Sequence, residues 1–164
     1  MKKNLFAFVV FLICCLSVQA QKSALVMDLA YRNKFNYTNW GVGLQYKYNL
    51  PANFRAATDF VAYFPEESSF GLDFGINLQY QLHVCNNLSI YPFAGGIMSN
   101  HSFSGIPNNV NETGFGLSFG AGVEYSVSKK GFLNFDYRYN LIDKKKNAWY
   151  TDYSLIRLGY GFRF

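Results

Sequence analysis

The sequence predicts an all-β protein: an eight-stranded antiparallel up-and-down β-barrel that spans a membrane. Three observations lead to this prediction. Segments of about ten residues alternate strictly between bulky apolar and small or polar side chains. Short turns alternate with longer polar connections, and no apolar run of helix-spanning length follows the leader. Because lipid offers no partner to backbone groups, a chain without such a helix crosses a membrane only as a closed barrel.

The first twenty residues have the pattern of a secretory signal peptide. Lys2 and Lys3 give a basic start, an apolar run covers 5–16, and small residues precede Gln21. We therefore expect residues 1–20 to be cleaved and residues 21–164 to form one domain, the barrel. Cleavage would leave Cys85 as the only cysteine, which excludes an intramolecular disulfide.

The composition excludes several classes of protein. Half of the residues are hydrophobic and 20% are aromatic, which is far from the composition of a disordered chain. The chain has 15 basic and 10 acidic residues, so loss of Lys2 and Lys3 leaves 13 − 10 = +3. This small excess is unlike a nucleic-acid-binding protein, and no nucleic-acid partner is expected.

Two segments show the strand pattern most clearly. From Phe70 to Leu82 every even position is aromatic or aliphatic, whereas the odd positions are glycine, aspartate or amide side chains. From Ile156 to Phe164 the even positions are again bulky, and the odd positions are Arg157, Arg163 and two glycines. A helix would mix these sets, because its faces repeat every 3.6 residues and those of a strand every two.

Six further strands complete the predicted barrel, at 25–32, 40–48, 54–64, 88–98, 115–127 and 133–141. The segment 88–98 is the least regular of them. Pro92 and the pair Gly95-Gly96 obscure its alternation and predict a bulge, so its facing stays open.

The predicted connections alternate in kind. Short turns rich in Asn, Pro and Gly are expected at 49–53, 83–87 and 128–131. The other connections are polar and mostly longer, at 33–39, 65–69, 99–113 and 142–151, of which 65–69 is as short as the turns. This layout is that of an outer-membrane barrel with both termini on the side of the short turns.

The bulky face of each strand is predicted to point outward to lipid. A soluble barrel of the lipocalin kind would turn that face inward, but an eight-stranded interior is too narrow for it. The remaining glycine-rich face would also be a poor surface for solubility. Aromatic residues gather at the strand ends as two expected interfacial girdles: Trp40, Phe64, Phe70 and Tyr153 at one, and Tyr48, Phe54, Tyr80, Tyr125 and Phe164 at the other.

The inward face then carries an unusual number of charges. Because an isolated buried ion costs several kcal/mol, these side chains must pair or stay hydrated. We expect an ion-pair and hydrogen-bond network that fills the lumen and leaves no continuous pore. A proton or ion path is the alternative. The expected lumen charges are Asp28, Arg32, Lys47, Arg55, Asp59, Asp73, Glu124, Asp136, Arg138, Arg157 and Arg163.

The leader, the eight alternating strands and the last strand, Ile156-Arg-Leu-Gly-Tyr-Gly-Phe-Arg-Phe164, together resemble the OmpA/OmpX-like, porin-like outer-membrane β-barrel family. The resemblance implies a multi-pass barrel in the outer membrane of a Gram-negative bacterium, surrounded by lipid and lipopolysaccharide. In that family the outer-membrane assembly machinery reads the last strand, which assigns this role to Tyr160, Phe162 and Phe164. The family includes adhesins and structural barrels, so the resemblance implies no individual task.

Catalytic and metal-binding candidates are few. Some eight-stranded barrels are lipid A acylases or deacylases, the latter with a Ser and a His near the outer rim. The corresponding candidates here are His101, Ser102, Ser104 and Glu112. They fall in a predicted loop without a base-to-nucleophile spacing, and a catalytic triad needs fixed geometry. His83 and Cys85 are two ligands without further partners nearby. We expect no enzyme activity, no metal and no cofactor.

The connection 142–151 contains the most distinctive loop residues, Lys144, Lys145, Lys146 and Trp149. They would suit contact with lipopolysaccharide phosphates or an acidic host surface, and the alternative is a solvated basic loop tip. The sequence therefore favours a structural or surface-interaction role of the adhesion type, with an unknown extracellular ligand. A small pore and a lipid A-modifying enzyme are the alternatives.

Overall fold

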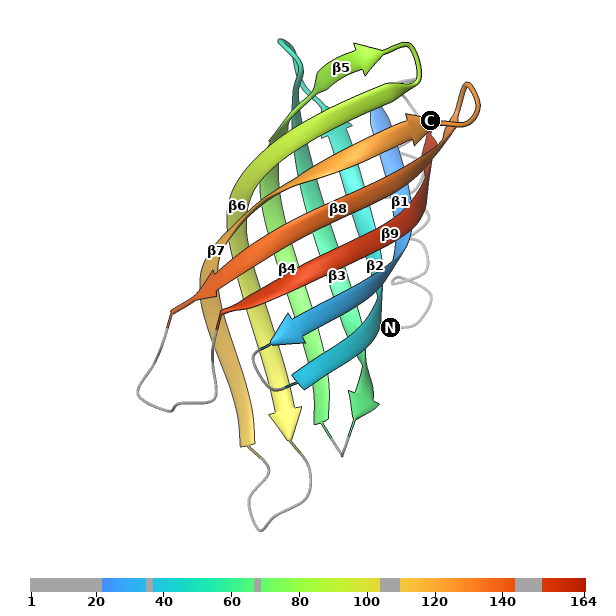
Figure 1. Ribbon diagram of the computed structural model, residues 1–164. Helices are drawn as coiled ribbons and strands as arrows, with labels where there is room; N and C mark the ends of the chain where they lie inside the picture. Colours follow the sequence, from blue (N-terminus) through green and yellow to red (C-terminus); the bar gives the residue numbers. More distant parts are fainter. Residues whose placement is uncertain (1–21, 35–36, 67–68, 104–109, 144–151) are drawn as a thin grey trace, which may run out of the picture.

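The computed structural model describes residues 22–34, 37–66, 69–103, 110–143 and 152–164, and most of these lie in strands (Figure 1). None of the described segments is a helix long and apolar enough to cross a membrane. The strands are β1 (Ser23–Lys34), β2 (Tyr37–Asn49), β3 (Phe54–Glu66), β4 (Ser69–Tyr80), β5 (Leu82–Cys85), β6 (Leu88–Phe103), β7 (Val110–Ser126), β8 (Gly131–Ile142) and β9 (Tyr153–Arg163).

The strands form one antiparallel sheet that closes on itself. β1 pairs with β2 on one side and with β9 on the other, where Leu25 lies opposite Phe162 and Tyr31 opposite Ile156. β5 continues β4 beyond Gln81, and both pair with β6, so the nine strand segments make eight barrel strands. The predicted closed eight-stranded barrel is confirmed, and the first and last strands leave no open edge between them.

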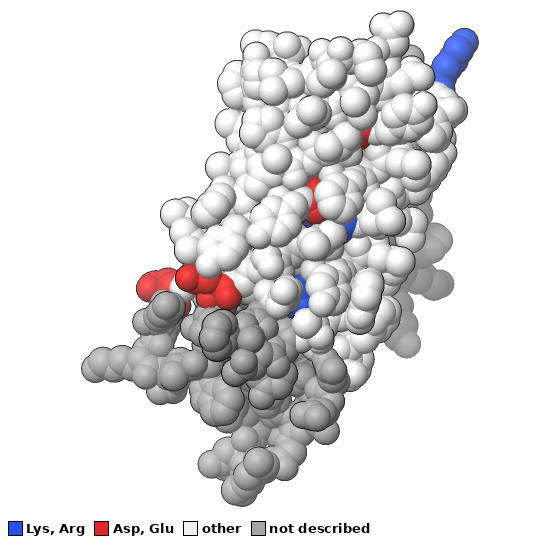
Figure 2. Space-filling model, viewed as in Figure 1, with Lys and Arg blue, Asp and Glu red and all other residues white. Residues whose placement is uncertain are grey.

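Side chains on the strands alternate between the outer surface and the lumen. On β4, Phe74, Ile76 and Leu78 are 42–57% exposed, whereas Asp73 and Asn77 are buried. Figure 2 shows that the strand surface on one side of the molecule is almost free of charged atoms. Aliphatic and aromatic side chains exposed at this density are stable against lipid, so the bulky face is the membrane face.

Glycines on the inner face make room for large lumen side chains. The ring of Tyr91 lies against Gly122, and the ring of Phe132 lies against Gly161, so a Cβ at either glycine would collide with the ring. An eight-stranded interior is only just wide enough for its own side chains. Each ring therefore fits because the neighbouring strand carries a glycine, and no side chain, at the position beside it.

The strand predicted at 88–98 is longer and more regular than the sequence indicated. β6 pairs with β7 without a register shift along its whole length, so the bulge expected near Pro92 is wrong. On the other side, β6 changes partner from β5 at Ile90 to β4 at Phe93. Pro92 lies in this gap, where its missing N–H interrupts no ladder on that side.

Most of the connections are shorter than predicted. The predicted turn 83–87 is a strand as far as Cys85, followed by a turn at 86–87. The predicted loop 99–113 is largely strand, because β6 continues to Phe103 and β7 begins at Val110. As Figure 1 shows, the turns at 50–53, 86–87 and 127–130 lie at the same end of the barrel as the C-terminus. We call this the turn end, and the opposite end the loop end.

Most of the predicted girdle residues lie on the outer surface at the strand ends. Trp40 and Phe64 are 58% and 52% exposed at the loop end, and Phe54 and Tyr125 are 40% and 49% exposed at the turn end. Tyr153 is an exception, because it is 3% exposed and points into the lumen. Tyr153 is an odd-numbered position of β9, as is Arg157, and the odd positions of this strand face the lumen. Its predicted place in the girdle is therefore wrong.

Candidate functional site

The structure places the expected lumen charges inside the barrel. Ten of the eleven are buried, and Arg163, at the turn end, has a side chain 26% exposed. These eleven side chains are six cations and five anions, so their charges nearly balance. They form three clusters along the barrel: a turn-end cluster (Lys47, Arg55, Glu124, Arg163), a central cluster (Asp28, Asp59, Asp136, Arg138, Arg157) and a loop-end cluster (Arg32 and Asp73 with Tyr63, Ser99 and Tyr153).

The turn-end cluster gathers three cations around one carboxylate. Lys47 Nζ and Arg55 Nη2 each lie 2.8 Å from Glu124 Oε1, and Arg163 Nη2 lies 3.5 Å from Glu124 Oε2. The guanidinium of Arg163 also lies 4.2 Å from the ring centroid of Phe132. Glu124 is thus held by side chains from β2, β3 and β9 while it stands on β7.

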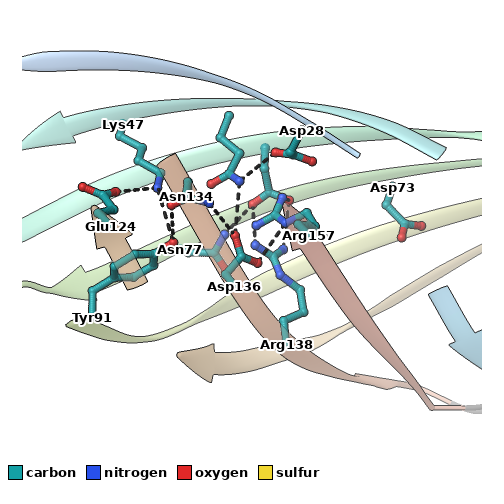
Figure 3. A network of polar contacts seen from close by, with 12 residues as sticks. Asp28, Lys47, Asp73, Asn77, Tyr91, Glu124, Asn134, Asp136, Arg138 and Arg157 are labelled. Atoms are coloured by element: carbon teal, nitrogen blue, oxygen red, sulfur yellow. Dashed lines mark hydrogen bonds and ion pairs between the residues drawn. The ribbon is translucent and has the colours of Figure 1, made fainter. Parts of the chain in front are cut away.

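Asn134 joins the turn-end cluster to the central one. Its Oδ1 accepts hydrogen bonds from Lys47 Nζ at 2.7 Å and from the Tyr91 hydroxyl at 2.6 Å. Its Nδ2 donates to Asp136 Oδ2 at 3.1 Å. Figure 3 shows these contacts continuing into the central cluster as one connected set.

The central cluster is built on two aspartate–arginine pairs. Arg138 donates from Nη1 and Nη2 to the two oxygens of Asp59, at 2.9 and 3.2 Å. Arg157 Nε donates to Asp136 Oδ1 at 2.9 Å, and its Nη1 lies 3.4 Å from Asp59 Oδ1. A bidentate arginine–carboxylate pair is among the strongest polar contacts in proteins and fixes the geometry of both side chains.

Neutral amides complete the central cluster. Gln45 Nε2 donates to Asp28 Oδ2 at 2.8 Å and to Asp136 Oδ2 at 3.2 Å. Asn77 Nδ2 donates to Asp59 Oδ2 at 2.5 Å. The central cluster contains three carboxylates but only two arginines. The amides therefore supply additional hydrogen-bond donors to these carboxylates.

In the loop-end cluster, three hydroxyl groups donate hydrogen bonds to the carboxylate of Asp73. Tyr63 and Tyr153 donate to Asp73 Oδ2, and Ser99 donates to Asp73 Oδ1, each at 2.6 Å. The guanidinium of Arg32 lies 3.8 Å from the ring centroid of Tyr63 and 5.5 Å from that of Tyr153. In Figure 3, Asp73 lies apart from the connected set of the other two clusters.

Several lumen side chains belong to the network without being among the expected charges. The amides Gln45, Asn77 and Asn134 are buried at the inward positions that the alternation of their strands predicts. Tyr91 and Phe93 are buried on β6, the strand whose facing stayed open. Both are odd-numbered positions, as are the buried Ile97 and Ser99. This alternation along β6 is the pattern that indicates its inner face.

Other predicted site residues are placed as follows. The backbones of His101 and Ser102 lie in β6 and that of Glu112 in β7, with His101 opposite Glu112, so their placement in a loop was wrong. Ser104 lies outside the described residues. Lys144, Lys145, Lys146 and Trp149 do so as well.

Cys85 is free and exposed on β5. Within the described ranges, no group of three or more His, Cys, Asp or Glu side chains could hold a metal ion. Tyr160 and Phe162 are 51% and 47% exposed on the membrane face, where they lie opposite Met27 and Leu25 of β1.

The profile of the outer membrane protein beta-barrel domain matches residues 6–164, nearly the whole chain. The chain belongs to this outer-membrane β-barrel family. It is therefore an integral protein of the Gram-negative outer membrane, in agreement with its outward apolar face. No curated protein sequence is significantly similar to it.

Solved structures share the fold at low sequence identity. Neisserial surface protein A (NspA) has a TM-score of 0.71 and 19% identity over 87% of this chain and 96% of its own. Ail, the attachment invasion locus protein of Yersinia pestis, has a TM-score of 0.64 and 16% identity over 89% and 100%. The outer membrane enzyme PagL has a TM-score of 0.58 and 9% identity over 86% and 99%. At these identities the likeness establishes the fold alone.

Proposed function

We propose that this protein is a non-enzymatic outer-membrane barrel with a structural or surface-interaction role of the adhesion type, and that its lumen is closed. The observation that carries the proposal is a set of polar contacts that cross the lumen from wall to wall. The barrel itself is then a rigid support, and the interaction with the surroundings falls to its loop end.

Three contacts span the full width of the barrel. Around the ring the strands follow the order β1, β2, β3, β4, β6, β7, β8, β9. Lys47 on β2 reaches Glu124 on β7, Asp59 on β3 reaches Arg138 on β8, and Asp73 on β4 reaches Tyr153 on β9. Each pair is four positions apart in a ring of eight, so each lies across a diameter. We call these three contacts the cross-braces.

The cross-braces stand at the turn end, in the middle and at the loop end. The rings of Tyr91, Phe93 and Phe132 are also buried inside the barrel. An eight-stranded interior has no width to spare beyond such side chains. This filling supports a closed lumen rather than a small pore.

The surface-interaction part of the proposal rests on the loop end. The name of Ail includes attachment and invasion, and Ail has also been solved with sucrose octasulfate, a heparin analogue. Lys144, Lys145 and Lys146 supply three adjacent cations in the connection between β8 and β9. By analogy, a sulfated or phosphorylated polysaccharide is a suitable ligand, and lipopolysaccharide is one source of such groups.

Binding of cells to immobilised heparin and to purified lipopolysaccharide tests this part. The triple variant Lys144→Gln, Lys145→Gln, Lys146→Gln should lower retention on at least one of the two surfaces. The matched control is Lys129→Gln with Lys130→Gln, which removes cations from the turn at the opposite, periplasmic end. Unchanged retention in the triple variant, or an equal loss in the control, would count against a role for this loop.

The absence of catalysis is tested by the mass of lipid A. Expression of the protein should leave the lipid A mass spectrum unchanged, whereas an acylase or deacylase would add or remove the mass of an acyl chain. A mass change that disappears in a His101→Ala variant would identify an enzyme and overturn the proposal.

The assembly machinery is the remaining proposed partner. Replacement of Tyr160 and Phe162 by Ser, or deletion of Phe164, should leave the protein in the periplasm, where it is degraded. The control replaces Leu133 and Phe135 by Ser, since these are also about half exposed on the membrane face, but on β8. A heat-modifiable barrel in the outer membrane at normal amount, for the β9 variants, would contradict the role.

A further inference from the structure

Three polar side chains stand in one row on the inner wall of the barrel. Asn140 on β8 lies opposite Ser118 on β7, Ser118 lies opposite Gly95 on β6, and Gly95 lies opposite Asn77 on β4. We call these four residues the amide row. The register alone makes its members neighbours across adjacent strands.

The amide row is buried but poorly satisfied. Asn140, Ser118 and Asn77 are 0%, 1% and 3% exposed. Both side-chain amide atoms of Asn140, the hydroxyl oxygen of Ser118 and Oδ1 of Asn77 have no hydrogen-bond partner within the described part of the chain. Buried polar groups in folded proteins are bonded either to protein or to ordered water, because leaving them dry is strongly unfavourable.

Gly95 brings the unpartnered groups of the row close together. It contributes no side chain, and Asn77 Oδ1 lies over it, since a Cβ at Gly95 would approach this oxygen to 2.7 Å. No side chain of Gly95 therefore separates the unpartnered oxygens of Asn77 and Ser118.

The unpartnered groups of the amide row suit a small neutral ligand that both donates and accepts hydrogen bonds. Asn140 Nδ2 and the Ser118 hydroxyl are donors, whereas the Oδ1 atoms of Asn140 and Asn77 are acceptors. Arg138 stands two residues from Asn140 on β8, and its Nε is another donor without a partner in the described chain. A metal cation would be repelled by Arg138, and an anion would meet the two amide oxygens and the carboxylate of Asp59, which Asn77 contacts.

We infer that the amide row is a binding site for ordered water inside the barrel. Water satisfies donors and acceptors together, and each buried water usually makes about three hydrogen bonds. The site also joins two clusters. Asn140 neighbours Arg138 of the central cluster along β8 and lies opposite Tyr153 of the loop-end cluster. Bound water thus extends the hydrogen-bonded network toward the loop end without opening a pore.

A crystal structure that resolves ordered solvent tests the site directly. The expected result is a water oxygen within about 3.2 Å of both the Asn140 amide and the Ser118 hydroxyl. Asn134 is the internal control, because it is equally buried but its amide is bonded to Lys47, Tyr91 and Asp136. Absence of solvent density at the amide row, in a map that shows ordered water elsewhere, would overturn the inference.

A stability measurement gives an independent answer. In a dry row, Asn140→Leu would remove an unsatisfied amide and raise the urea midpoint of unfolding. In a hydrated row the same change removes an anchor of the water, so the midpoint should fall and the unfolding equilibrium constant should rise by roughly tenfold, the effect of one lost partner. Ser118→Ala, a smaller change, should shift the midpoint in the same direction. A rise of the midpoint in both variants would contradict the water site.

Discussion

The middle and the loop end of the lumen are braced across the same width by different chemistry. In the middle, Arg138 meets Asp59 as a charged bidentate pair. At the loop end, Tyr153 reaches Asp73 with a neutral hydroxyl. An ionic brace requires both partners, because either one alone is a buried charge, whereas Asp73 keeps the donors of Tyr63 and Ser99 when one hydroxyl is lost. The two regions should therefore respond very differently to the loss of a single side chain.

The largest effect is expected from Arg138→Leu. It leaves the Asp59 carboxylate with Asn77 and with the more distant Nη1 of Arg157. The free energy of unfolding should fall by about 3–5 kcal/mol, measured by urea unfolding of the barrel in detergent micelles. A loss below about 1 kcal/mol would mean that the pair is not needed. The double variant Asp59→Leu with Arg138→Leu should recover most of the loss, since no charge is then left alone.

A smaller effect is expected from Tyr153→Phe. The ring is retained and only the hydroxyl donated to Asp73 is lost, which should cost about 1.5 kcal/mol in the same unfolding assay. Tyr63→Phe is the matched variant, because its hydroxyl donates to the same Asp73 oxygen at the same distance. A loss as large as that of Arg138→Leu would erase the contrast between the two regions.

Arg163→Gln should have less effect than either. Its guanidinium is partly exposed at the turn end and lies 3.5 Å from Glu124, which keeps Lys47 and Arg55 at 2.8 Å. We expect a loss below about 1 kcal/mol that shrinks further at high salt, because water and ions screen the pair. A loss of stability that does not depend on salt would contradict a solvent-screened pair between Arg163 and Glu124.

The smallest change lies outside the lumen and serves as a reference. Ala52, in the turn between β2 and β3, has φ of 59° in the left-handed region. Glycine adopts this conformation without a steric cost, so Ala52→Gly should raise the stability slightly, by about 0.5 kcal/mol. A decrease in the urea midpoint would show that this turn has a different conformation in the membrane protein.

Much of the fold could be predicted because a strand repeats every two residues. The alternation of residues 70–82 and 156–164 identified the inner and outer faces of these segments, and closure by β1 and β9 followed from the need to remove edges. The prediction failed where local chemistry and pattern disagreed. Pro92 indicated a bulge, whereas tertiary pairing with β7 continues through it. Tyr153 was assigned by residue type to the interface, although its parity places it inside.

The cross-braces could not be predicted from the sequence. Alternation tells which side chains enter the lumen but not at what height each strand presents them. That height depends on the stagger between neighbouring strands, summed over half of the barrel. The pairing of Lys47 with Glu124, rather than with Asp136, is set by this stagger. The amide row has the same origin, since it exists only because four strands align Asn77, Gly95, Ser118 and Asn140.

Single-channel recording in planar lipid bilayers tests the closed, cross-braced lumen most directly. Purified protein that retains the folded eight-stranded form should insert and show no steady conductance. Steady single-channel currents from that intact form would show that the three cross-braces do not close the lumen, and would favour the small pore instead.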